Sequence, residues 1–264
     1  MLSRLSPARR RFVVGLVALL LVAVVAVVVT ALVQRRSSAA HDQSRPGPVL
    51  LVPGYGGSEE SLASLATALR TGGQDATVVS LPDQARGDLD GQTQALGAAV
   101  DQALKRTGAA SVDLVGYSAG GIVARLWVTE GGGRHVTRRL VTLGSPHHGT
   151  EIAEMGTVVS GTCPTACQQL APDSAVLSRL ASEPLPAGVV MLSLWSTSDD
   201  VVLPPSSAVI AGVPSPSLQS ICASSTVRHG GLPSDRLVQG LIAQALGSGP
   251  LPTWTTADCN RLSS

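Results

Sequence analysis

The stretch SVDLVGYSAGGIVARLW, residues 111–127, decides the fold of this chain. Its first five residues have the mostly apolar character of a short buried strand, and the residues from Ala119 onward have that of a helix. Residues 116–120, which join them, match the pattern Gly-x-Ser-x-Gly. A serine on such a strand-to-helix turn is strained and projects its hydroxyl from the carboxyl edge of the sheet, while the glycines avoid collisions with neighbouring elements. The pattern therefore makes Ser118 the candidate nucleophile.

Short apolar runs alternate with helical segments on both sides of this motif. The predicted strands are residues 49–52, 76–81, 112–115, 139–143 and 189–194, and the predicted helices are residues 58–69, 92–106, 119–129, 174–180 and 235–246. Such alternation predicts an α/β fold with a mostly parallel sheet and helices on both faces. The run 209–213 is ambiguous. Residues 150–188 contain no clean strand, and they are either a lid over the carboxyl edge or an ordinary surface connection.

A serine hydroxyl is a weak nucleophile at neutral pH and needs a base. Among the five histidines, only His229 follows both the serine and a plausible acid, which is the chain order for a serine on this kind of turn. We expect it at the end of a strand, in a loop before the last helix. The acid is expected in the loop after the strand 189–194, where Asp199 and Asp200 are both candidates. Spacing alone does not choose between these two aspartates.

Two backbone N–H groups are expected to stabilise the oxyanion of the reaction. One belongs to Ala119, the residue after the nucleophile, and the other to the loop 52–58, with Tyr55 as the donor. The glycines of this loop let the backbone approach a substrate closely. The loop lacks the third glycine of a dinucleotide-binding Gly-x-Gly-x-x-Gly motif, so it does not predict a nucleotide cofactor.

Residues 12–33 form an uncharged run of mostly Val, Leu and Ala. As a helix the run spans about 33 Å, enough to cross the hydrocarbon core of a bilayer. Four arginines precede it and three follow it, so the basic residues 1–11 are expected to stay in the cytoplasm. We expect an uncleaved anchor, because a cleavable signal has a shorter apolar run; the alternative is a signal peptide cut after residues 38–40. In either case the body lies outside the cytoplasm, membrane-anchored or secreted.

Residues 34–47 are rich in Ser, Ala, Arg, Gln, Gly and Pro and predict a flexible linker, which leaves residues 48–264 as one domain with a sizeable core. Charge also divides the chain near this point. Residues 1–45 hold seven Arg and one Asp, a net charge of +6, whereas residues 46–264 hold twelve basic and seventeen acidic residues, a net charge of −5. A nucleic-acid-binding protein would carry its basic patch on the folded body, so that class is excluded. We expect a monomer.

The four cysteines, Cys163, Cys167, Cys222 and Cys259, fit an oxidising compartment. An even count predicts two disulfides, with three possible pairings. In one of them Cys163 and Cys167 close a small local loop, and Cys222 and Cys259 tie down the C-terminal tail. The cysteines and histidines lack the spacing of a zinc site, so no metal is expected.

Five stretches of the chain occur in the same order as in bacterial lipases. They are LVPGYGG at 51–57, GYSAGG at 116–121, LGSPHHGT at 143–150, the stretch 193–202 and VRHGG at 227–231. On these motifs, over roughly residues 48–246, the chain resembles an actinobacterial member of the α/β-hydrolase superfamily and is similar to Bacillus-type and class 2 lipases. The block LGSPHHGT is the most specific of them, since such lipases carry Thr/Ser-Pro-His-x-Gly there.

The resemblance implies an α/β-hydrolase domain at residues 48–264. It also implies a serine ester hydrolase, a lipase or carboxylesterase, that acts on acyl esters or lipids without a metal or an organic cofactor. Asp199 is implied as the catalytic acid, because Val-Val follows it after one residue, and Asp200 is held in reserve. The LGSPHHGT block implies that His147 and His148 shape the substrate site rather than act as the base.

Gly54 and Tyr117 lie beside predicted catalytic groups and are further candidates for substrate contact. The fold does not determine the reaction, because an acyltransferase, a thioesterase or an amidase would use the same Ser-His-Asp triad. A third possibility is a non-catalytic surface protein that uses a hydrolase-like body for binding. All three members of the triad are present in the sequence, which favours an enzyme.

Overall fold

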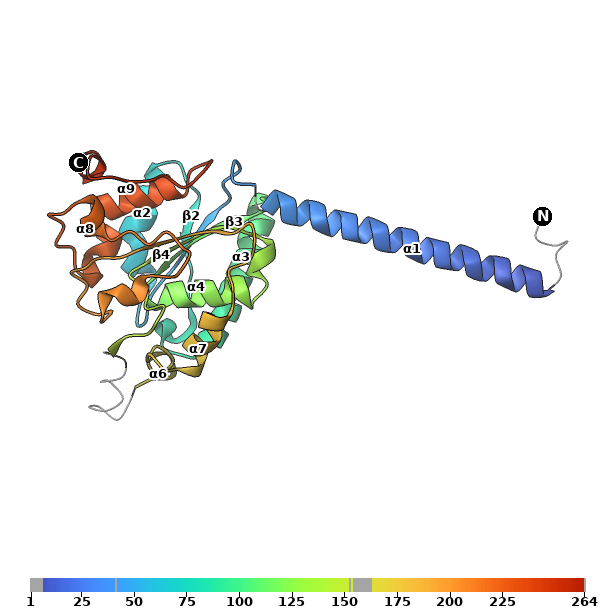
Figure 1. The fold of residues 1–264 in the computed structure, drawn as a ribbon, viewed down its shortest axis with the longest axis horizontal. Helices are drawn as coiled ribbons and strands as arrows, with labels where there is room; N and C mark the ends of the chain where they lie inside the picture. The colour runs from blue at the N-terminus through green and yellow to red at the C-terminus, as the bar shows by residue number, and fades with distance from the viewer. Residues whose placement is uncertain (1–6, 41, 152, 154–162, 264) are drawn as a thin grey trace. The chain divides into compact units, whose positions relative to one another are not determined.

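The computed structural model describes residues 7–40, 42–151, 153 and 163–263. They belong to two compact units, Met1–Ala39 and Ala40–Ser264. The first unit is the helix α1 (Pro7–Ala40), drawn in blue in Figure 1. Its segment Gly15–Leu32 is exposed and has a mean hydropathy of 3.0, so α1 is long and apolar enough to cross a membrane.

Helix α1 continues beyond the predicted membrane segment, which ends at Val33. Residues 34–40, predicted as part of a flexible linker, are helical. This stretch consists of two alanines, one glutamine, two arginines and two serines. Alanine, glutamine and arginine have high helix propensities, and the next proline after Pro7 is Pro46. Among the described residues of the predicted linker, the irregular part is therefore 42–47.

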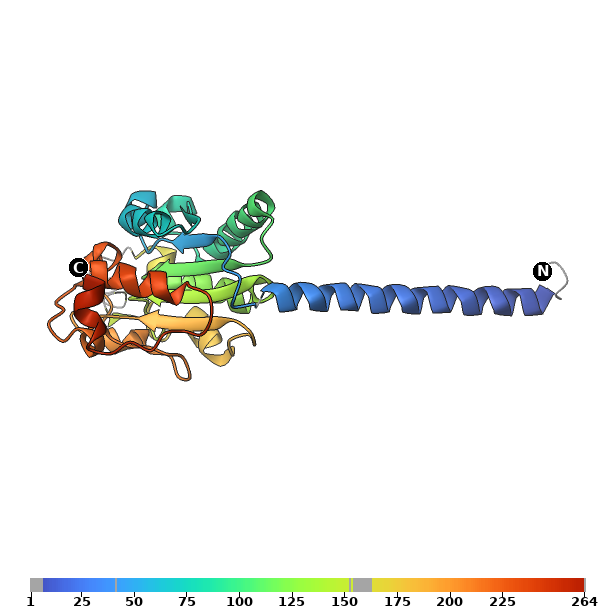
Figure 2. The same cartoon turned by 90° about the horizontal axis from the view of Figure 1, so that it is seen from above.

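The second unit is built on a five-stranded parallel sheet in the order β2-β1-β3-β4-β5, which confirms the predicted fold class (Figure 2). The strands are β1 (Val49–Val52), β2 (Ala76–Val78), β3 (Val112–Tyr117), β4 (Thr137–Leu143) and β5 (Val190–Leu194). Every residue of β1 and β4 is buried, as expected for a sheet covered on both faces. In the register of the sheet, Val115 on the central β3 pairs with Leu51 and with Val141. The carboxyl ends of these strands therefore meet at one edge.

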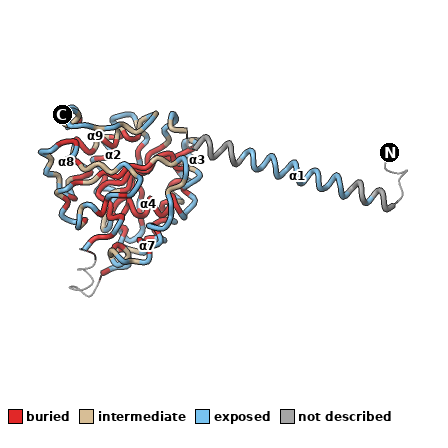
Figure 3. The backbone as a smooth tube through the Cα atoms, viewed as in Figure 1, coloured by how far each residue is buried: buried red, intermediate tan, exposed pale blue. Residues whose placement is uncertain are grey.

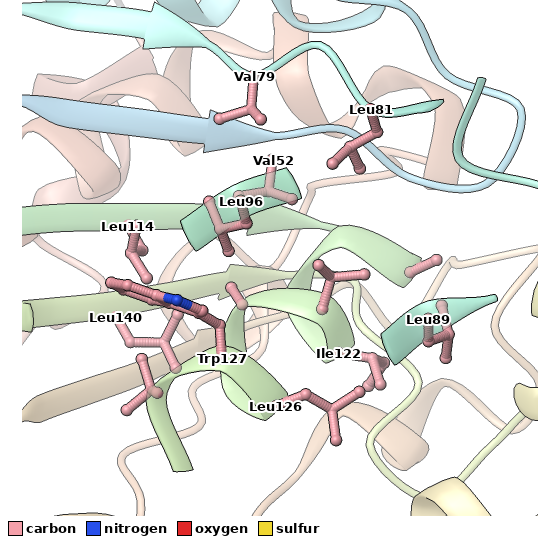
Figure 4. Close-up of a cluster of buried hydrophobic side chains, with 14 of the residues drawn as sticks. Val52, Val79, Leu81, Leu89, Leu96, Leu114, Ile122, Leu126, Trp127 and Leu140 are labelled. Atoms are coloured by element: carbon pink, nitrogen blue, oxygen red, sulfur yellow. The ribbon is translucent and has the colours of Figure 1, made fainter. Parts of the chain in front are cut away.

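Helices cover both faces of the sheet, and Figure 1 shows α2 and α9 on one side of the strands and α4 and α7 on the other. The first face carries α3 (Leu89–Thr107), α4 (Ala119–Thr129), α6 (Thr165–Gln169) and α7 (Ala175–Ser182), and the second carries α2 (Ala63–Thr71), α8 (Leu218–Ile221), α9 (Arg236–Ala245) and α10 (Asp258–Ser263). Consecutive strand residues point to opposite faces, so Leu114 belongs to the first core cluster and Val115 to the second. Figure 4 shows Trp127 of α4 and Leu96 of α3 in the first cluster.

The interior of the second unit is formed by its strands and by α4. All eleven residues of α4 are buried. Figure 3 shows this pattern as a continuous buried centre with exposed residues around it. The strand-to-helix segment that follows β3 is therefore anchored on both sides in the core.

Three predicted elements differ from the structure. The predicted helix 58–69 begins as a 3-10 helix (Glu59–Leu62) before α2, and the predicted strand 76–81 ends at Val78. The strand expected before His229 is absent from the described residues 222–228, where the N–H of Ser225 instead donates to the carbonyl of Cys222 and closes a turn. The ambiguous run 209–213 is likewise irregular.

The predicted lid region, residues 150–188, is described only in part, since residue 152 and residues 154–162 lie outside the described residues. The remainder contains α6 and α7. Helix α6 is joined to the start of α3, because the side chain of Gln169 accepts a hydrogen bond of 2.8 Å from the N–H of Leu89. Whether this region acts as a lid remains a prediction.

Two disulfides join Cys163 to Cys167 and Cys222 to Cys259. This is one of the three pairings that the sequence allows. The first joins the residue before the N-cap of α6 to a residue within α6, and the second fastens α10 to the residue that follows α8.

Two consecutive arginines of β4 tie both ends of the second unit to the amino edge of the sheet. Arg138, which is fully buried, pairs with Asp113 on β3 and donates to the carbonyls of Gln43, Leu246 and Gly247. Arg139 donates to the side chain of Gln43 at 2.9 Å and also to the carbonyls of Ala245 and Gly249. Arg138 and Arg139 therefore bind both the segment at Gln43, where the chain enters the unit, and residues 245–249 at the end of α9 and after it.

Candidate active site

Ser118 lies between β3 and α4 in a conformation that is rare for a residue with a side chain. Its φ is 55° and its ψ is −128°. The glycines around it allow this turn. A Cβ on Gly116 would lie 2.4 Å from the Cα of Gly121, and a Cβ on Gly120 would lie 2.2 Å from the carbonyl oxygen of Val52. Both contacts are shorter than any real Cβ contact, so the motif glycines are sterically required where the sequence places them.

The side chains of Ser118, His229 and Asp199 form one hydrogen-bonded chain. The Nε2 of His229 is 3.0 Å from the Oγ of Ser118, and its Nδ1 is 2.7 Å from the Oδ2 of Asp199. His229 is 5% exposed and Asp199 is 6% exposed, so water has little access to either group. The structure thus brings together the three residues predicted as nucleophile, base and acid. Such an arrangement can accept the serine proton on the imidazole and stabilise the imidazolium that results.

The two candidate acids have different surroundings. Asp199 faces the imidazole with one oxygen, while the other accepts the N–H groups of Val201 and Val202 at 2.9 and 2.8 Å. Asp200 accepts the backbone N–H of His229 at 3.2 Å and forms an ion pair of 3.1 Å with Arg228. Only Asp199 contacts the imidazole, so the geometry favours the residue that the resemblance implies. Asp200 instead holds the backbone of the same histidine.

The backbone of His229 is also held by Tyr117. The hydroxyl of Tyr117 donates to the carbonyl of His229 at 3.1 Å, and the two rings lie 5.1 Å apart between centroids. Burial raises the pKa of Tyr117, and the charges of Asp199 and Asp200 raise it further, so the hydroxyl stays a donor. In the structure, Tyr117 contacts the main chain and the ring of His229, the predicted base. Its predicted contact with substrate remains a prediction.

The loop after β1, which is predicted to supply one oxyanion donor, lies close to the serine. A Cβ on Gly54 would be 2.8 Å from the Cβ of Ser118 and 3.4 Å from its Oγ, so the loop after β1 passes directly beside the nucleophile. Tyr55 follows in this loop and is 39% exposed. Ala119 is the first residue of α4, so the helix itself supplies no acceptor for its N–H, and the helix dipole favours negative charge there.

The two neighbouring histidines lie apart from this chain of hydrogen bonds. His147 is 1% exposed, and its Nε2 is 3.0 Å from the Oγ1 of Thr142. Burial lowers the pKa of His147 well below its usual value, and a nearby arginine and His148 add to the effect. His148 is exposed, and its Nε2 lies 2.9 Å from the carbonyl oxygen of Val209. His147 is thus buried and His148 is exposed, and contact of either histidine with substrate remains a prediction.

Several polar residues that join the catalytic loops carry no recognisable signal in the sequence. Ser196, in the loop of the acid, donates to the carbonyl of Val227 in the loop of the base. Gln219 donates to the hydroxyl of Ser196 and to the carbonyl of Ser225, each at 3.0 Å. Serine and glutamine are common in any surface loop, so only the folded chain reveals this function. Among the described residues, no group of three or more His, Cys, Asp or Glu could hold a metal ion.

Comparisons with known proteins agree with this architecture. A family model described as palmitoyl protein thioesterase matches residues 48–202. The triacylglycerol lipases of Pseudarthrobacter phenanthrenivorans and Burkholderia plantarii are each 30% identical over 125 residues, which is 45% of this chain and 39% and 34% of those lipases. The chain therefore matches less than half the length of these relatives.

Solved structures show the same fold. Lipase B of Aspergillus fumigatus superposes with a TM-score of 0.63 at 21% identity, over 80% of this chain and 55% of that one. The propeptide form of lipase BlEst2 of Bacillus licheniformis has a TM-score of 0.66 at 17% identity, over 80% and 52%. These likenesses confirm the α/β-hydrolase fold. Since the family model covers more than half of the chain, from β1 through both Ser118 and Asp199, the chain belongs to the palmitoyl protein thioesterase family of α/β-hydrolases.

Proposed function

We propose that this protein is a serine hydrolase that cleaves carboxylic esters, of the lipase or carboxylesterase type, through an acyl-enzyme intermediate. The observation that carries the proposal is the continuous chain of hydrogen bonds from Ser118 through His229 to Asp199, with the serine on a strained turn. The lipase relatives support an ester as the substrate.

In the first half of the reaction, the Oγ of Ser118 attacks the acyl carbonyl carbon while its proton passes to the Nε2 of His229. Asp199 stabilises the imidazolium through Nδ1, and the N–H groups of Tyr55 and Ala119 donate to the oxyanion. The tetrahedral intermediate collapses with cleavage of the bond to the leaving oxygen, which takes the proton from His229. The alcohol departs and the acyl group remains as an ester of Ser118.

In the second half, a water molecule gives a proton to His229 and attacks the acyl carbon. The new tetrahedral intermediate collapses with cleavage of the bond to the Oγ of Ser118, which recovers the proton from His229. The carboxylic acid leaves, and the enzyme is restored. No step requires a metal or an organic cofactor.

A thioesterase is the second candidate, and the description of the matching family favours it. A thioester and an oxygen ester present the same acyl carbon to Ser118, and they differ only in the leaving atom. The geometry of the three side chains therefore supports both reactions.

The proposal includes the arrangement of the chain. The apolar helix can serve as a signal or an anchor, and the two disulfides fit an extracytoplasmic location. We propose that residues 12–33 anchor the protein, that residues 1–11 stay in the cytoplasm and that residues 48–264 act outside it as a monomer on acyl esters or lipids. Part of residues 150–188 would serve as a lid.

The full chain in lipid nanodiscs, with octanoyl oxygen ester and octanoyl thioester substrates, tests the reaction. We expect hydrolysis of the ester, its loss in Ser118→Ala, and covalent labelling of the unsubstituted protein by a fluorophosphonate. Ser80→Ala, on an exposed serine, is the matched control and should keep full activity. Undiminished hydrolysis by Ser118→Ala would refute the assignment, and a strong preference for the thioester would establish the second candidate instead.

A further inference from the structure

A cavity apart from the candidate active site lies on the face of the sheet that carries α4. Its volume is about 640 Å³, and it is bounded by Arg125 of α4, by His148, by residues 181–185 at and after the end of α7 and by residues 210–213. It shares no lining residue with the group formed by Ser118, His229 and Asp199. Its volume falls within the range of small-molecule sites, about 300–1,000 Å³.

Arg125 is a buried cation without a counterion among the described residues. Arg125 is only 6% exposed. One nitrogen, Nη2, donates to the carbonyl of Leu180 at 3.1 Å, while Nε is buried and has no hydrogen-bond partner. A guanidinium keeps its charge in proteins. Leu180 lies in the last turn of α7, and the negative end of a helix compensates only about half a charge.

A buried charge is costly unless it is paired. The cavity beside Arg125 offers the space for a partner that the described residues do not supply. The one carboxylate in the wall, that of Glu183, belongs to an exposed residue and forms no ion pair with Arg125 in the described structure. An anion that enters the cavity can therefore pair with the guanidinium of Arg125, which lies in the cavity wall.

The rest of the wall is mostly apolar. It includes Ala181, Pro184, Leu185, Ile210 and Val213. His148 also lines the cavity, with its Nε2 engaged by the carbonyl of Val209. A small inorganic anion would leave this apolar surface uncovered. A ligand with an anionic head and an apolar body would use both parts of the wall.

We propose that this cavity binds an organic carboxylate with a short apolar chain, whose carboxylate is held by Arg125. The chain of the ligand lies against Ile210, Val213 and Leu185. His148, from the LGSPHHGT block, lies in the wall of this cavity. The proposed site would therefore give part of that block a role outside the catalytic residues.

Titration of the full chain in lipid nanodiscs with hexanoate tests the proposal, with binding to empty nanodiscs subtracted. We expect saturable binding that falls by about tenfold or more in Arg125→Met, the effect of losing one charge-assisted interaction. Ala211→Trp, which fills the mouth of the cavity from an exposed position, should weaken binding as much and leaves Arg125 intact. This second variant decides the matter if Arg125→Met does not fold. Hexanol should bind much more weakly than hexanoate.

Arg70→Met is the matched control. Arg70 also donates to a main-chain carbonyl, that of Ala76, but it lies on α2, which covers the opposite face of the sheet. Its loss should leave hexanoate binding unchanged. The proposal is overturned if the unsubstituted chain shows no saturable binding, or if Arg125→Met and Ala211→Trp both bind as tightly as the unsubstituted chain. Inorganic phosphate that binds as tightly as hexanoate would overturn the assignment to an organic carboxylate.

Discussion

At the scale of single residues, the candidate site depends on close contacts that exclude any larger side chain. Ser118 has a positive φ, and strain of this kind persists only where the surroundings enforce it. Here the conformation of Ser118 is held by the close packing of Gly120 against the backbone of β1 and of Gly116 against the backbone of α4. The loop that carries Tyr55 is held against the serine by the same contacts. Loss of one glycine should therefore disturb both the nucleophile and the oxyanion donors.

Gly120→Ala tests this packing. The new Cβ would lie 2.2 Å from the carbonyl oxygen of Val52, so the backbone must move, and overpacking of this kind costs about 1–3 kcal/mol. We expect a lower unfolding free energy together with a large loss of ester hydrolysis. The control is Gly91→Ala on the exposed side of α3, where the nearest atom would be 3.8 Å away. Urea unfolding that shows no difference between the two variants would contradict the steric argument.

The two adjacent aspartates give a second test at this scale. Asp199→Asn should reduce kcat by about 10⁴, because an amide favours the wrong imidazole tautomer and cannot stabilise the imidazolium. Asp200→Asn keeps an acceptor for the N–H of His229 and loses only a half-exposed ion pair, so kcat should fall less than about tenfold. Rates on a p-nitrophenyl ester, measured on variants with unchanged circular dichroism, distinguish them. Equal losses in the two variants would show that Asp199 has no special role.

His147 predicts how stability depends on pH. Because burial lowers its pKa in the folded protein, the unfolded chain binds a proton more readily than the native state at acid pH. Stability should be full above the unfolded pKa of about 6.5 and should fall as the pH drops below it, by up to about 1.4 kcal/mol per pH unit. Urea unfolding of His147→Gln from pH 5 to 7 should show a smaller dependence. The control is His135→Gln, because His135 does not contribute to the lowered pKa of His147. It should keep the original slope; an identical slope for both variants would contradict the assignment.

At the scale of secondary-structure elements, regular segments follow from sequence patterns and their connections do not. The strand at 112–117 and the helix at 119–129 are predictable, because an apolar run of strand length meets a helical pattern at a glycine-flanked serine. The expected strand before His229 is wrong for a physical reason. A turn at Cys222 and the hydrogen bond from Ser196 to Val227 hold residues 222–228 in place. Neither contact depends on the alternation of apolar and polar residues from which a strand is predicted.

The candidate site was predictable to a similar extent. Chain order singles out His229, and the folded chain separates Asp199 from Asp200 through contacts that join loops 30 residues apart. The burial of His147, whose ring contacts Thr142 on β4, cannot be recognised in the local motif LGSPHHGT. Long-range packing of this kind cannot be read from local periodicity.

The disulfides provide a prediction about the last elements of the chain. Cys222 and Cys259 are 37 residues apart, and in the chain-entropy model their bond stabilises the fold by about 4 kcal/mol. The bond between Cys163 and Cys167 spans four residues and contributes about 2 kcal/mol in the same model. The double variant Cys222→Ser/Cys259→Ser should therefore unfold at a clearly lower temperature than Cys163→Ser/Cys167→Ser. Calorimetry that gives the reverse order would rule out this account of the tail.

At the scale of the whole molecule, the chain consists of an apolar helix and an acidic α/β-hydrolase unit. The hydrolase unit has two functional ends. Its carboxyl edge carries Ser118 and the loops around it. Its amino edge carries Arg138 and Arg139, which hold the entering segment at Gln43 and the segment after α9. Within this unit, the residues proposed for the reaction and the arginines that hold Gln43 therefore lie at opposite ends of the strands.

The arginines at the amino edge decide where α1 can be removed to obtain a soluble recombinant fragment. A truncation that starts at Pro48, where sequence patterns alone place the domain, deletes Gln43 and leaves two buried guanidinium groups with fewer acceptors. A truncation that starts at Asp42 retains them. We expect fragment 42–264 to melt several degrees above fragment 48–264 in differential scanning fluorimetry, with both retaining the disulfides. Equal melting temperatures would mean that the cut at Pro48 costs nothing, and the shorter fragment would then be the better one to crystallise.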